Sequence, residues 1–336
     1  MDNLSDAKKA LDLGEETGVK IMFMCNELRT KTDSCIAMVK DHPALYGYFL
    51  RDEPWCSDFA ALGEWAGRIK KYDNEHMIYL NLYPSYVDVR GIGAKDYKDY
   101  VEKFISEVDL PMISFDNYPV VFEGVRQAWY ENLEIIRECA REHDLPFWAF
   151  ALSTPHWTYP EPTMASLRIQ QYTNLAYGAA GLQYFTYWCP QPHQFDFHDA
   201  PIRVDGSRSQ NYDKVKILNK EILSRAGVFV GSEVVSVCHT GDSIPPKTTR
   251  LTDLPEGVRK LDTHGAGAVV SELRKDNGTR YMMVVNRSIE TPLDLDVEFS
   301  HKAYSVDREG RVIPIGRKPS TIIVEPGDAA IFRLKK

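Results

Sequence analysis

The fold is decided by the stretch that runs from Leu45 to Trp55, LYGYFLRDEPW. Its first part, Leu45–Arg51, is apolar throughout instead of at alternate positions, which is typical of a strand covered on both faces. Pro54 lacks the backbone N–H that a neighbouring strand would need, so it marks the end of the strand. We therefore predict a buried parallel strand that ends in charged residues.

Further runs of the same character recur along the first two thirds of the chain. They are Val19–Cys25, Met77–Tyr83, Pro111–Asp116, Pro146–Ala151 and Gly181–Trp188. Amphipathic stretches separate them, namely Asp58–Tyr72, Ala94–Val108, Val125–His143 and Thr163–Gly178. Alternation of strand and helix predicts parallel pairing with right-handed crossovers. Because no GxGxxG or Walker sequence follows a strand, a (β/α)8 TIM-type barrel is favoured over an open nucleotide-binding sheet.

The number of strands in this barrel is short of the eight that closure requires. Only six runs are visible, and the stretch Leu4–Gly18 is a predicted helix that leads into the first of them. We expect a barrel that lacks its first two strands in this chain, with an upstream segment supplying them. A partial barrel closed by a partner chain and strands overlooked in the sequence are the alternatives.

The pattern changes after residue 230, beyond a predicted helix at Asn211–Ala226. Short strand-like runs follow at Gly265–Leu273, Thr279–Asn286, Leu293–Phe299, Arg311–Ile315, Thr321–Val324 and Ala329–Leu334. Turn sequences such as Asp276–Gly278 separate them, which predicts an antiparallel β-sandwich. We therefore expect a barrel-like catalytic domain over residues 1–230 and a β-sandwich domain over residues 231–336.

Composition excludes several classes of protein. Among the 336 residues, 43% are hydrophobic and 26% are charged, which argues against disorder. The 40 Lys and Arg against 48 Asp and Glu give a net charge of −8, which argues against nucleic-acid binding. No apolar run approaches the roughly 20 residues that span a membrane. The six cysteines form no CxxC pair, so no zinc ribbon is expected, and we expect no cofactor. Assembly of the chain into a homo-oligomer is compatible with the sequence. The polar N-terminus is no signal peptide, so secretion or a periplasmic location would need an upstream signal segment.

Glu53 is the first candidate for chemistry. Hydrolysis of a glycosidic bond needs two carboxyl groups, one of which donates a proton from a partly apolar setting that raises its pKa. Glu53 follows an apolar strand and stands beside Pro54 and Trp55. The alternative is a surface carboxylate in a charged turn. The position of Glu53 at the carboxyl end of a strand favours the catalytic role.

Three segments resemble known enzymes. His42–Pro54 resembles the fourth-strand segment of clan A glycoside hydrolases, which ends in Asn-Glu-Pro or Asp-Glu-Pro. Met112–Pro119 looks like the sixth strand of the family 42 β-galactosidase group, and Gln183–Ile222, which includes His198, is similar to that group's eighth strand and following helix. The resemblance implies hydrolysis of a β-linked, galactose-like sugar, with Glu53 as the acid/base.

The same resemblance implies two further roles and one departure. Asp52 stands where the family has an Asn that contacts the sugar 2-hydroxyl, although an ionised Asp only accepts hydrogen bonds. Trp188 corresponds to the aromatic floor of the sugar subsite. In strand seven, Ala151 occupies the position of the family's nucleophilic Glu. Either another carboxylate replaces that Glu, or the standard retaining mechanism is absent.

Several carboxylates are candidates for that replacement: Asp116, Glu161, Asp196 and Asp199. We rank Asp116 first because it ends a strand and faces the same rim as Glu53, with a helix N-cap or turn role as the alternative. Asp196 and Asp199, together with His193 and His198, also suggest a metal site, but a hydrogen-bonded lid is favoured. Glu27 ends the first visible strand, where an ion pair with a nearby arginine such as Arg29 is favoured over a substrate contact.

Cleft positions after the strands carry a set of rings that we expect to contact substrate: Trp55, Tyr83, Tyr118, His156, Trp188 and His198. Core packing is their alternative role. The leading hypothesis is a glycoside hydrolase that uses Glu53 and Asp116. A catalytically inactive carbohydrate-binding protein on the same fold is the second hypothesis, because of Ala151. A Mg²⁺-dependent barrel enzyme using Glu27, Asp52 and Asp116 is the third.

Overall fold

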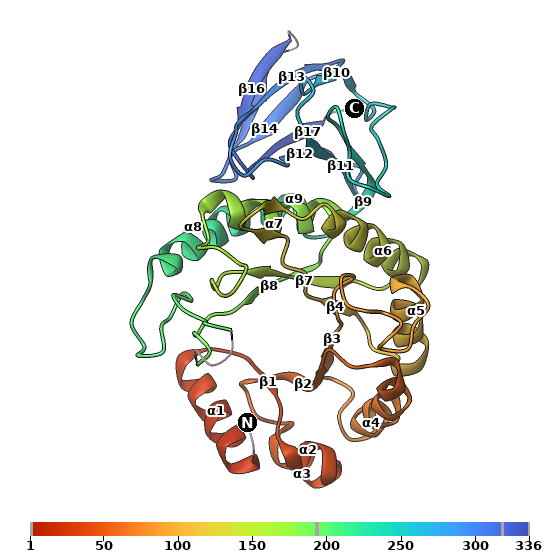
Figure 1. Ribbon diagram of the computed structural model, residues 1–336, viewed down its shortest axis with the longest axis vertical. Coiled ribbons are helices and arrows are strands. Elements are labelled where there is room, and N and C mark those ends of the chain that lie inside the picture. Colours follow the sequence, from red (N-terminus) through yellow and green to blue (C-terminus); the bar gives the residue numbers. More distant parts are fainter. Residues whose placement is uncertain (1–2, 192–194, 317–318, 335–336) are drawn as a thin grey trace. The chain divides into compact units, whose positions relative to one another are not determined.

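The computed structural model describes residues 3–191, 195–316 and 319–334 (Figure 1). Contacts between Cα atoms divide the chain into two compact units. The first unit consists of the chain up to Asp116 together with Glu138–Trp148, and the second consists of Asn117–Arg137 and the chain from Ala149 onward. None of the described helices is both long enough and apolar enough to cross a membrane.

The first unit alternates strands with helices. Its elements are α1 (Leu4–Thr17), β1 (Ile21–Phe23), α2 (Asn26–Thr30), α3 (Thr32–Val39), β2 (Leu45–Asp52), the 3-10 turn η1 (Cys56–Asp58), α4 (Phe59–Tyr72), β3 (Met77–Asn81), α5 (Tyr97–Val108) and β4 (Ile113–Phe115). Strands β1, β2 and β3 form one parallel sheet in that order, and a parallel bridge between Leu82 and Phe115 extends it toward β4. Figure 1 shows α2, α3 and α4 on one side of this sheet. The predicted parallel pairing is confirmed.

Local sequence explains where these elements begin and end. The side chain of Asn3 accepts a hydrogen bond from the Asp6 N–H and caps α1, which stops at Gly18 in the left-handed conformation, with φ of 71°. Gly47 lets β2 approach β3, because a Cβ at that position would clash with the Met77 carbonyl. Phe59 packs its ring against Tyr100 and Phe104, with ring centroids 5.4 and 6.1 Å apart. These buried rings hold α4 against α5.

The second unit begins with a short hairpin and continues into helices and an antiparallel domain. Its elements are β5 (Val120–Val121), β6 (Gly124–Val125), α7 (Met164–Tyr177), β8 (Gly181–Phe185), α8 (Gln210–Ser224), α9 (Ala226–Phe229), β9 (Ser232–His239), β10 (Val258–Asp262), β11 (Ala268–Lys275), β12 (Arg280–Asn286), β13 (Leu293–Phe299), β14 (Ala303–Val306), β15 (Val312–Ile315), β16 (Ser320–Val324) and β17 (Ala329–Leu334). Helix α6 (Ala128–Glu142) and strand β7 (Phe147–Leu152) each include a boundary between the units. The N–H of Ser153, just beyond β7, donates to the Phe185 carbonyl of β8 at 2.8 Å.

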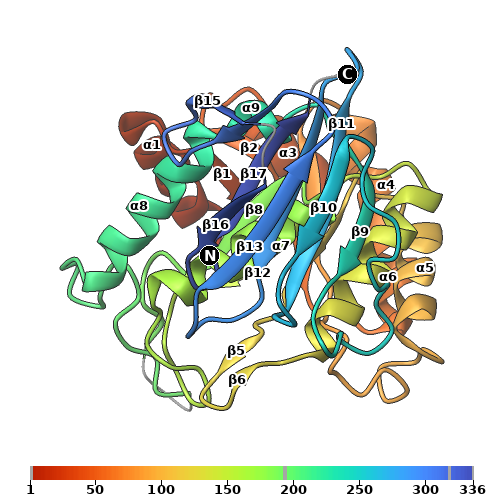
Figure 2. The same cartoon turned by 90° about the horizontal axis from the view of Figure 1, so that it is seen from above.

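The antiparallel domain consists of two sheets, as predicted. One sheet has the order β10-β13-β16, whose strands lie side by side in Figure 2, and the other has the order β15-β14-β17-β12-β11-β9. Apolar side chains that include Val284, Leu295 and Phe332 form its core. Strands β9, β10 and β14 were not predicted. Strand β9 alternates buried and exposed positions and β10 is largely exposed, so neither forms a continuous apolar run.

Helix α7 is buried on most of its surface. Its sequence is only weakly amphipathic, so it does not indicate which face is buried. The reason is a second partner: the Ser271 hydroxyl of β11 donates to the Ala176 carbonyl of α7 at 2.7 Å. The residues on both sides of position 230 belong to the second unit. All six predicted strand runs of residues 1–230 contain a strand, but the described residues do not close into a barrel.

Candidate functional site

The carboxyl end of β2 has an irregular backbone. Its register with β3 shifts between Phe49 and Asp52, so that Asp52 pairs with Asn81. The N–H of Glu53 then donates to the Asn81 carbonyl at 2.9 Å. Glu53 has φ of 45°, a left-handed conformation that is uncommon for a residue other than glycine and costs free energy. The shift and the left-handed residue together set the direction of the Glu53 side chain.

Asn81 joins two carboxylates through its amide group. Its Nδ2 donates to Asp52 Oδ1 at 3.2 Å and to Asp116 Oδ1 at 2.7 Å. Its Oδ1 accepts from the Ser114 hydroxyl at 3.0 Å, and Ser114 Oγ lies 2.9 Å from the Tyr79 hydroxyl. Because Ser114 uses its hydrogen on Asn81, the Tyr79 hydroxyl donates to Ser114. This chain of hydrogen bonds fixes which end of the Asn81 amide faces the carboxylates.

The carboxyl groups at the ends of β2 and β4 interact electrostatically. Burial raises the pKa of Glu53 to about 8, and the charges of Asp116 and Asp52 act in the same direction. Burial also raises the pKa of Asp52, although its hydrogen bond from Asn81 opposes the shift. Asp52 is exposed as a whole residue, yet protein atoms surround its carboxylate. Asp116 is only 8% exposed. Glu53 is therefore predominantly protonated at neutral pH and can donate a proton.

This electrostatic arrangement predicts a pH dependence of stability. The pKa of Glu53 rises from 4.5 to about 8 on folding, so its contribution to stability is present below about 4.5 and is lost as the pH rises through about 8. The Glu53→Gln variant cannot ionise at this position, so its free energy of unfolding should lack this part of the dependence on pH. We expect urea unfolding to show the variant gaining stability relative to the parent between pH 4.5 and pH 9. A constant difference across that range would contradict the assigned pKa.

Trp55 and Tyr83, the predicted rings of the first unit, lie after the ends of β2 and β3. Trp55 is 53% exposed, and Tyr83 uses its carbonyl to accept the Tyr97 hydroxyl at 2.7 Å. Within the described part of the chain, no hydrogen bond joins either side chain to the carboxylates of Asp52, Glu53 and Asp116. Asn81, in contrast, was not predicted as a site residue. The sequence feature that could have identified Asn81 is its position as a polar residue at the end of an apolar run, in Asn81-Leu82-Tyr83-Pro84.

The second unit brings Tyr118 and His156 into one group of rings, here called the His156 cluster. Its members are Tyr118, His156, Tyr159, Phe185 and Phe197. The ring of His156 lies 4.5 Å from that of Phe197 and 4.8 Å from that of Tyr159, between centroids. Its Nδ1 lies 2.9 Å from the Thr154 carbonyl and donates to it, and burial lowers its pKa. His156 is therefore a neutral, packed histidine whose Nε2 is an acceptor.

Of the remaining predicted residues, His198 lies beside the cluster: its backbone N–H donates to the Pro155 carbonyl at 3.3 Å, and its charge adds to the lowering of the His156 pKa. Trp188 is 52% exposed, and His198 is exposed with Nδ1 donating to the Asp196 carbonyl at 2.7 Å. Glu161 accepts from Asn211 Nδ2 at 3.1 Å, and Asp199 accepts from Arg203 Nε at 2.5 Å. Both acids thus have structural partners within the second unit. His193 lies outside the described residues.

The expected ion pair between Glu27 and Arg29 is wrong. Glu27 Oε2 accepts the backbone N–H of Leu4 at 3.1 Å instead. The first N–H groups of a helix have no acceptor within the helix, and a carboxylate at that end satisfies one of them. Glu27 therefore supports the start of α1.

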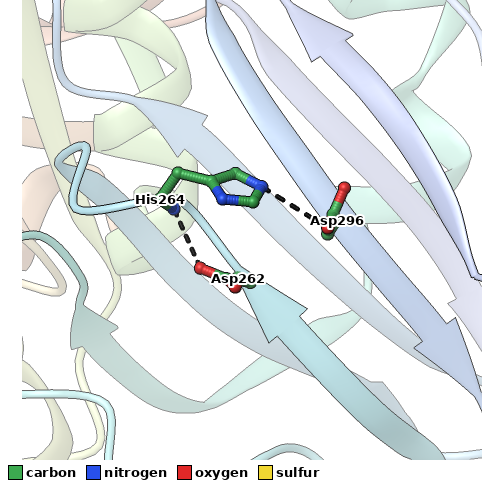
Figure 3. Close-up of side chains that lie close together, drawn as sticks. All are labelled: Asp262, His264 and Asp296. Carbon is green, nitrogen blue, oxygen red and sulfur yellow. Dashed lines mark hydrogen bonds and ion pairs between the residues drawn. The ribbon is translucent and has the colours of Figure 1, made fainter.

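One group of possible metal ligands occurs on the antiparallel domain (Figure 3). The group consists of Asp262, His264 and Asp296, whose ligating atoms lie within 4.8 Å of one another. Within the described ranges, no other group of three His, Cys, Asp or Glu residues meets this distance. The Lys260 ammonium lies 2.9 Å from Asp296 Oδ2 and 3.8 Å from Asp262 Oδ2, so a cation already neutralises these carboxylates. This group is a surface ion-pair network. Within the same ranges, Glu27, Asp52 and Asp116 do not form such a group.

The fold, with parallel strands followed by an antiparallel β domain, is similar to the folds of two solved glycoside hydrolases. A catalytic mutant of a GH42 β-galactosidase from G. stearothermophilus has a TM-score of 0.52 and 10% identity, over 93% of this chain and 82% of that chain. A GH51 α-L-arabinofuranosidase from Thermotoga petrophila has a TM-score of 0.50 and 11% identity, over 98% of this chain and 78% of that chain. At these identities the similarity concerns the fold.

Other solved structures match over less of their length. The chain spans 27% of a β-galactosidase from the psychrophilic Marinomonas ef1, with 14% identity over 50% of this chain and a TM-score of 0.40. No protein-family model matches the chain, and no curated protein matches its sequence.

Proposed function

We propose that this chain is a glycoside hydrolase in which Glu53 is the proton donor and Asp116 is the second carboxyl group. The observation that carries the proposal is the raised pKa of a carboxyl group, Glu53, next to a second, buried carboxylate that Asn81 holds in place. Two carboxyl groups in different protonation states are what hydrolysis of a glycosidic bond requires. The fold similarity to glycoside hydrolases supports the proposal.

In this mechanism Glu53 transfers its proton to the glycosidic oxygen while the bond from that oxygen to the anomeric carbon breaks. Asp116 either attacks the anomeric carbon or removes a proton from the attacking water. A separation of about 5–5.5 Å between the carboxyl groups gives retention of configuration, and about 6.5–9.5 Å gives inversion. Asn81 positions Asp116 through its 2.7 Å hydrogen bond. Asp52, the second acceptor of the Asn81 amide, lies next to Glu53 and contributes negative charge.

The finer assignments belong to the same proposal. We infer a β-linked, galactose-like sugar as substrate, and Trp55, Tyr83, Tyr118, His156, Trp188 and His198 as the rings that contact it. The parallel strands of residues 1–230 would then belong to a (β/α)8-type barrel, with residues 231–336 as a separate sandwich domain. The support is the resemblance of the segment ending in Asp52-Glu53-Pro54 to the fourth strand of clan A enzymes.

Asp116 can be tested by removing its carboxylate. In Asp116→Ala, turnover of aryl β-galactosides should fall by about 10²-fold or more, because no group then activates water or attacks the sugar. Added azide is a small nucleophile and should restore part of the rate, with a glycosyl azide as product. The matched control is Asp41→Asn, an exposed acid of the same unit, which should keep the parental rate. Parental activity in Asp116→Ala would contradict the assignment.

The second candidate function is binding of carbohydrate without hydrolysis. Ala151, which occupies the position of the nucleophile in the resemblance, is fully buried in β7 and carries no reactive group. A panel of aryl glycosides distinguishes the two functions. Release of the aryl group supports hydrolysis, whereas calorimetric binding of the same sugars without release supports a binding protein.

A further inference from the structure

Two cysteines of the first unit lie in contact with each other. Cys25 follows β1 and occupies the N-cap position of α2, while Cys35 lies in α3. Their Sγ atoms are 3.8 Å apart, and both residues are buried. All six cysteines belong to the described part of the chain, and no other two of them have sulfurs in contact there. The contact therefore distinguishes this pair from the other four thiols.

The two thiols differ in their access to solvent. Cys25 is 4% exposed and lines a pocket of about 620 Å³ that is formed by the first unit alone, between α2, the end of β2 and α4. Cys35 has no exposed surface and does not line this pocket. A small reagent that enters the pocket therefore meets Cys25 before Cys35.

Ionisation of the Cys35 thiol is also disfavoured. Burial raises the pKa of Cys35 to about 12, and the neighbouring Cys25 sulfur adds to the shift. Because the thiolate is the reactive form, Cys35 is a poor initial nucleophile. It becomes effective only when its partner carries a good leaving group at contact distance.

We propose that Cys25 and Cys35 are an oxidation site, at which a small-molecule disulfide converts the two thiols into an intramolecular disulfide. In the first step the Cys25 thiolate attacks the reagent, RSSR, and forms a Cys25–SR mixed disulfide with release of one RS⁻. In the second step the Cys35 sulfur attacks Cys25 Sγ and displaces the second RS⁻. The two thiol protons end on the released thiols, so two electrons pass from the protein to RSSR and two RSH form.

The step requires only a small movement. A disulfide bond is about 2.05 Å long, so the two sulfurs, now 3.8 Å apart, must approach each other by roughly 1.8 Å. The new bond encloses residues 26–34 and ties the end of β1 to α3. Because a cross-link restrains the unfolded chain, we expect the oxidised protein to resist unfolding better than the reduced protein.

The pair can be tested on the full chain with oxidised 2-mercaptoethanol as the disulfide. After treatment, all free thiols are alkylated under denaturing conditions, and the peptides are analysed by mass spectrometry without reduction. We expect one cross-linked species that contains Cys25 and Cys35 and has lost two hydrogen atoms, with Cys56, Cys139, Cys189 and Cys238 alkylated. Full alkylation of Cys25 and Cys35 after the treatment would overturn the proposal.

Two variants separate the chemical steps. Cys35→Ser should stop at the mixed disulfide on Cys25, because no thiol remains to displace the reagent. Cys25→Ser should leave Cys35 unmodified, because Cys35 is buried and protonated. The reverse pattern, with modification of Cys35 in Cys25→Ser, would contradict the assigned order of attack. Oxidation of the parent should also raise the urea concentration at its unfolding midpoint. The control is Cys139→Ser, which keeps both cysteines of the pair and should show the same rise after the same treatment. Both readouts are independent of glycosidase activity.

Discussion

Replacing Glu53 by glutamine is expected to lower the hydrolysis of glycosides with poor leaving groups by about 10²- to 10⁴-fold. The glutamine amide has nearly the same shape but cannot transfer a proton to the glycosidic oxygen. The loss should therefore depend on the leaving group. Unsubstituted phenyl glycosides, whose departing oxygen needs a proton, should lose most of their turnover, whereas 2,4-dinitrophenyl glycosides should lose far less.

The parent enzyme should show the corresponding pH dependence. Turnover of phenyl glycosides should be present at neutral pH and should decrease as the pH rises through about 8, where Glu53 loses its proton. The matched control is Glu16→Gln, an exposed glutamate of α1, which should retain parental kinetics. Equal losses for both leaving groups in Glu53→Gln would exclude Glu53 as the proton donor and would leave a structural role.

Replacing Asn81 by aspartate is expected to destabilise the folded protein by about 3 kcal/mol at pH 8. Asn81 Nδ2 donates to Asp52 and Asp116, and an ionised aspartate at position 81 would instead place a buried negative charge against two others. Protonation of the new group restores one O–H donor. The deficit should therefore shrink as the pH falls from 8 toward 4.5, which urea unfolding at several pH values measures.

The control for this substitution is Asn277→Asp in the exposed turn between β11 and β12. There the side-chain Oδ1 accepts the Thr279 N–H at 3.0 Å, and an aspartate oxygen does the same. This variant should stay within about 0.5 kcal/mol of the parent. An Asn81→Asp protein as stable as the parent at pH 8 would show that the hydrogen bonds between Asn81 and the two aspartates contribute nothing to stability.

Part of the candidate site was predictable because its signals are local. Glu53 and Asp116 each follow a short apolar run, and Pro54 and Pro119 mark where the chain leaves the strand. Both residues lie at strand ends in the structure, and the electrostatic effect of Asp116 on Glu53 shows that they are near each other. The expected role of Tyr83 rested on the same turn as Asn81, and it is the Asn81 amide that donates to Asp52 and Asp116. Which residue of that turn meets them depends on the register of β2 and β3, and the register is not visible in either strand alone.

The amino-acid sequence by itself determined the alternation of the longer strands and helices up to residue 230, the change to antiparallel strands after it, and the acid that ends β2, because periodicity and proline act over a few neighbouring residues. Tertiary structure decided the rest. The shift between Phe49 and Asp52 brings Asp52 opposite Asn81, the approach of β4 brings Asp116 to the same amide, and the resulting desolvation and negative charge raise the pKa of Glu53. These effects depend on distances between residues far apart in the chain, and only folding sets such distances.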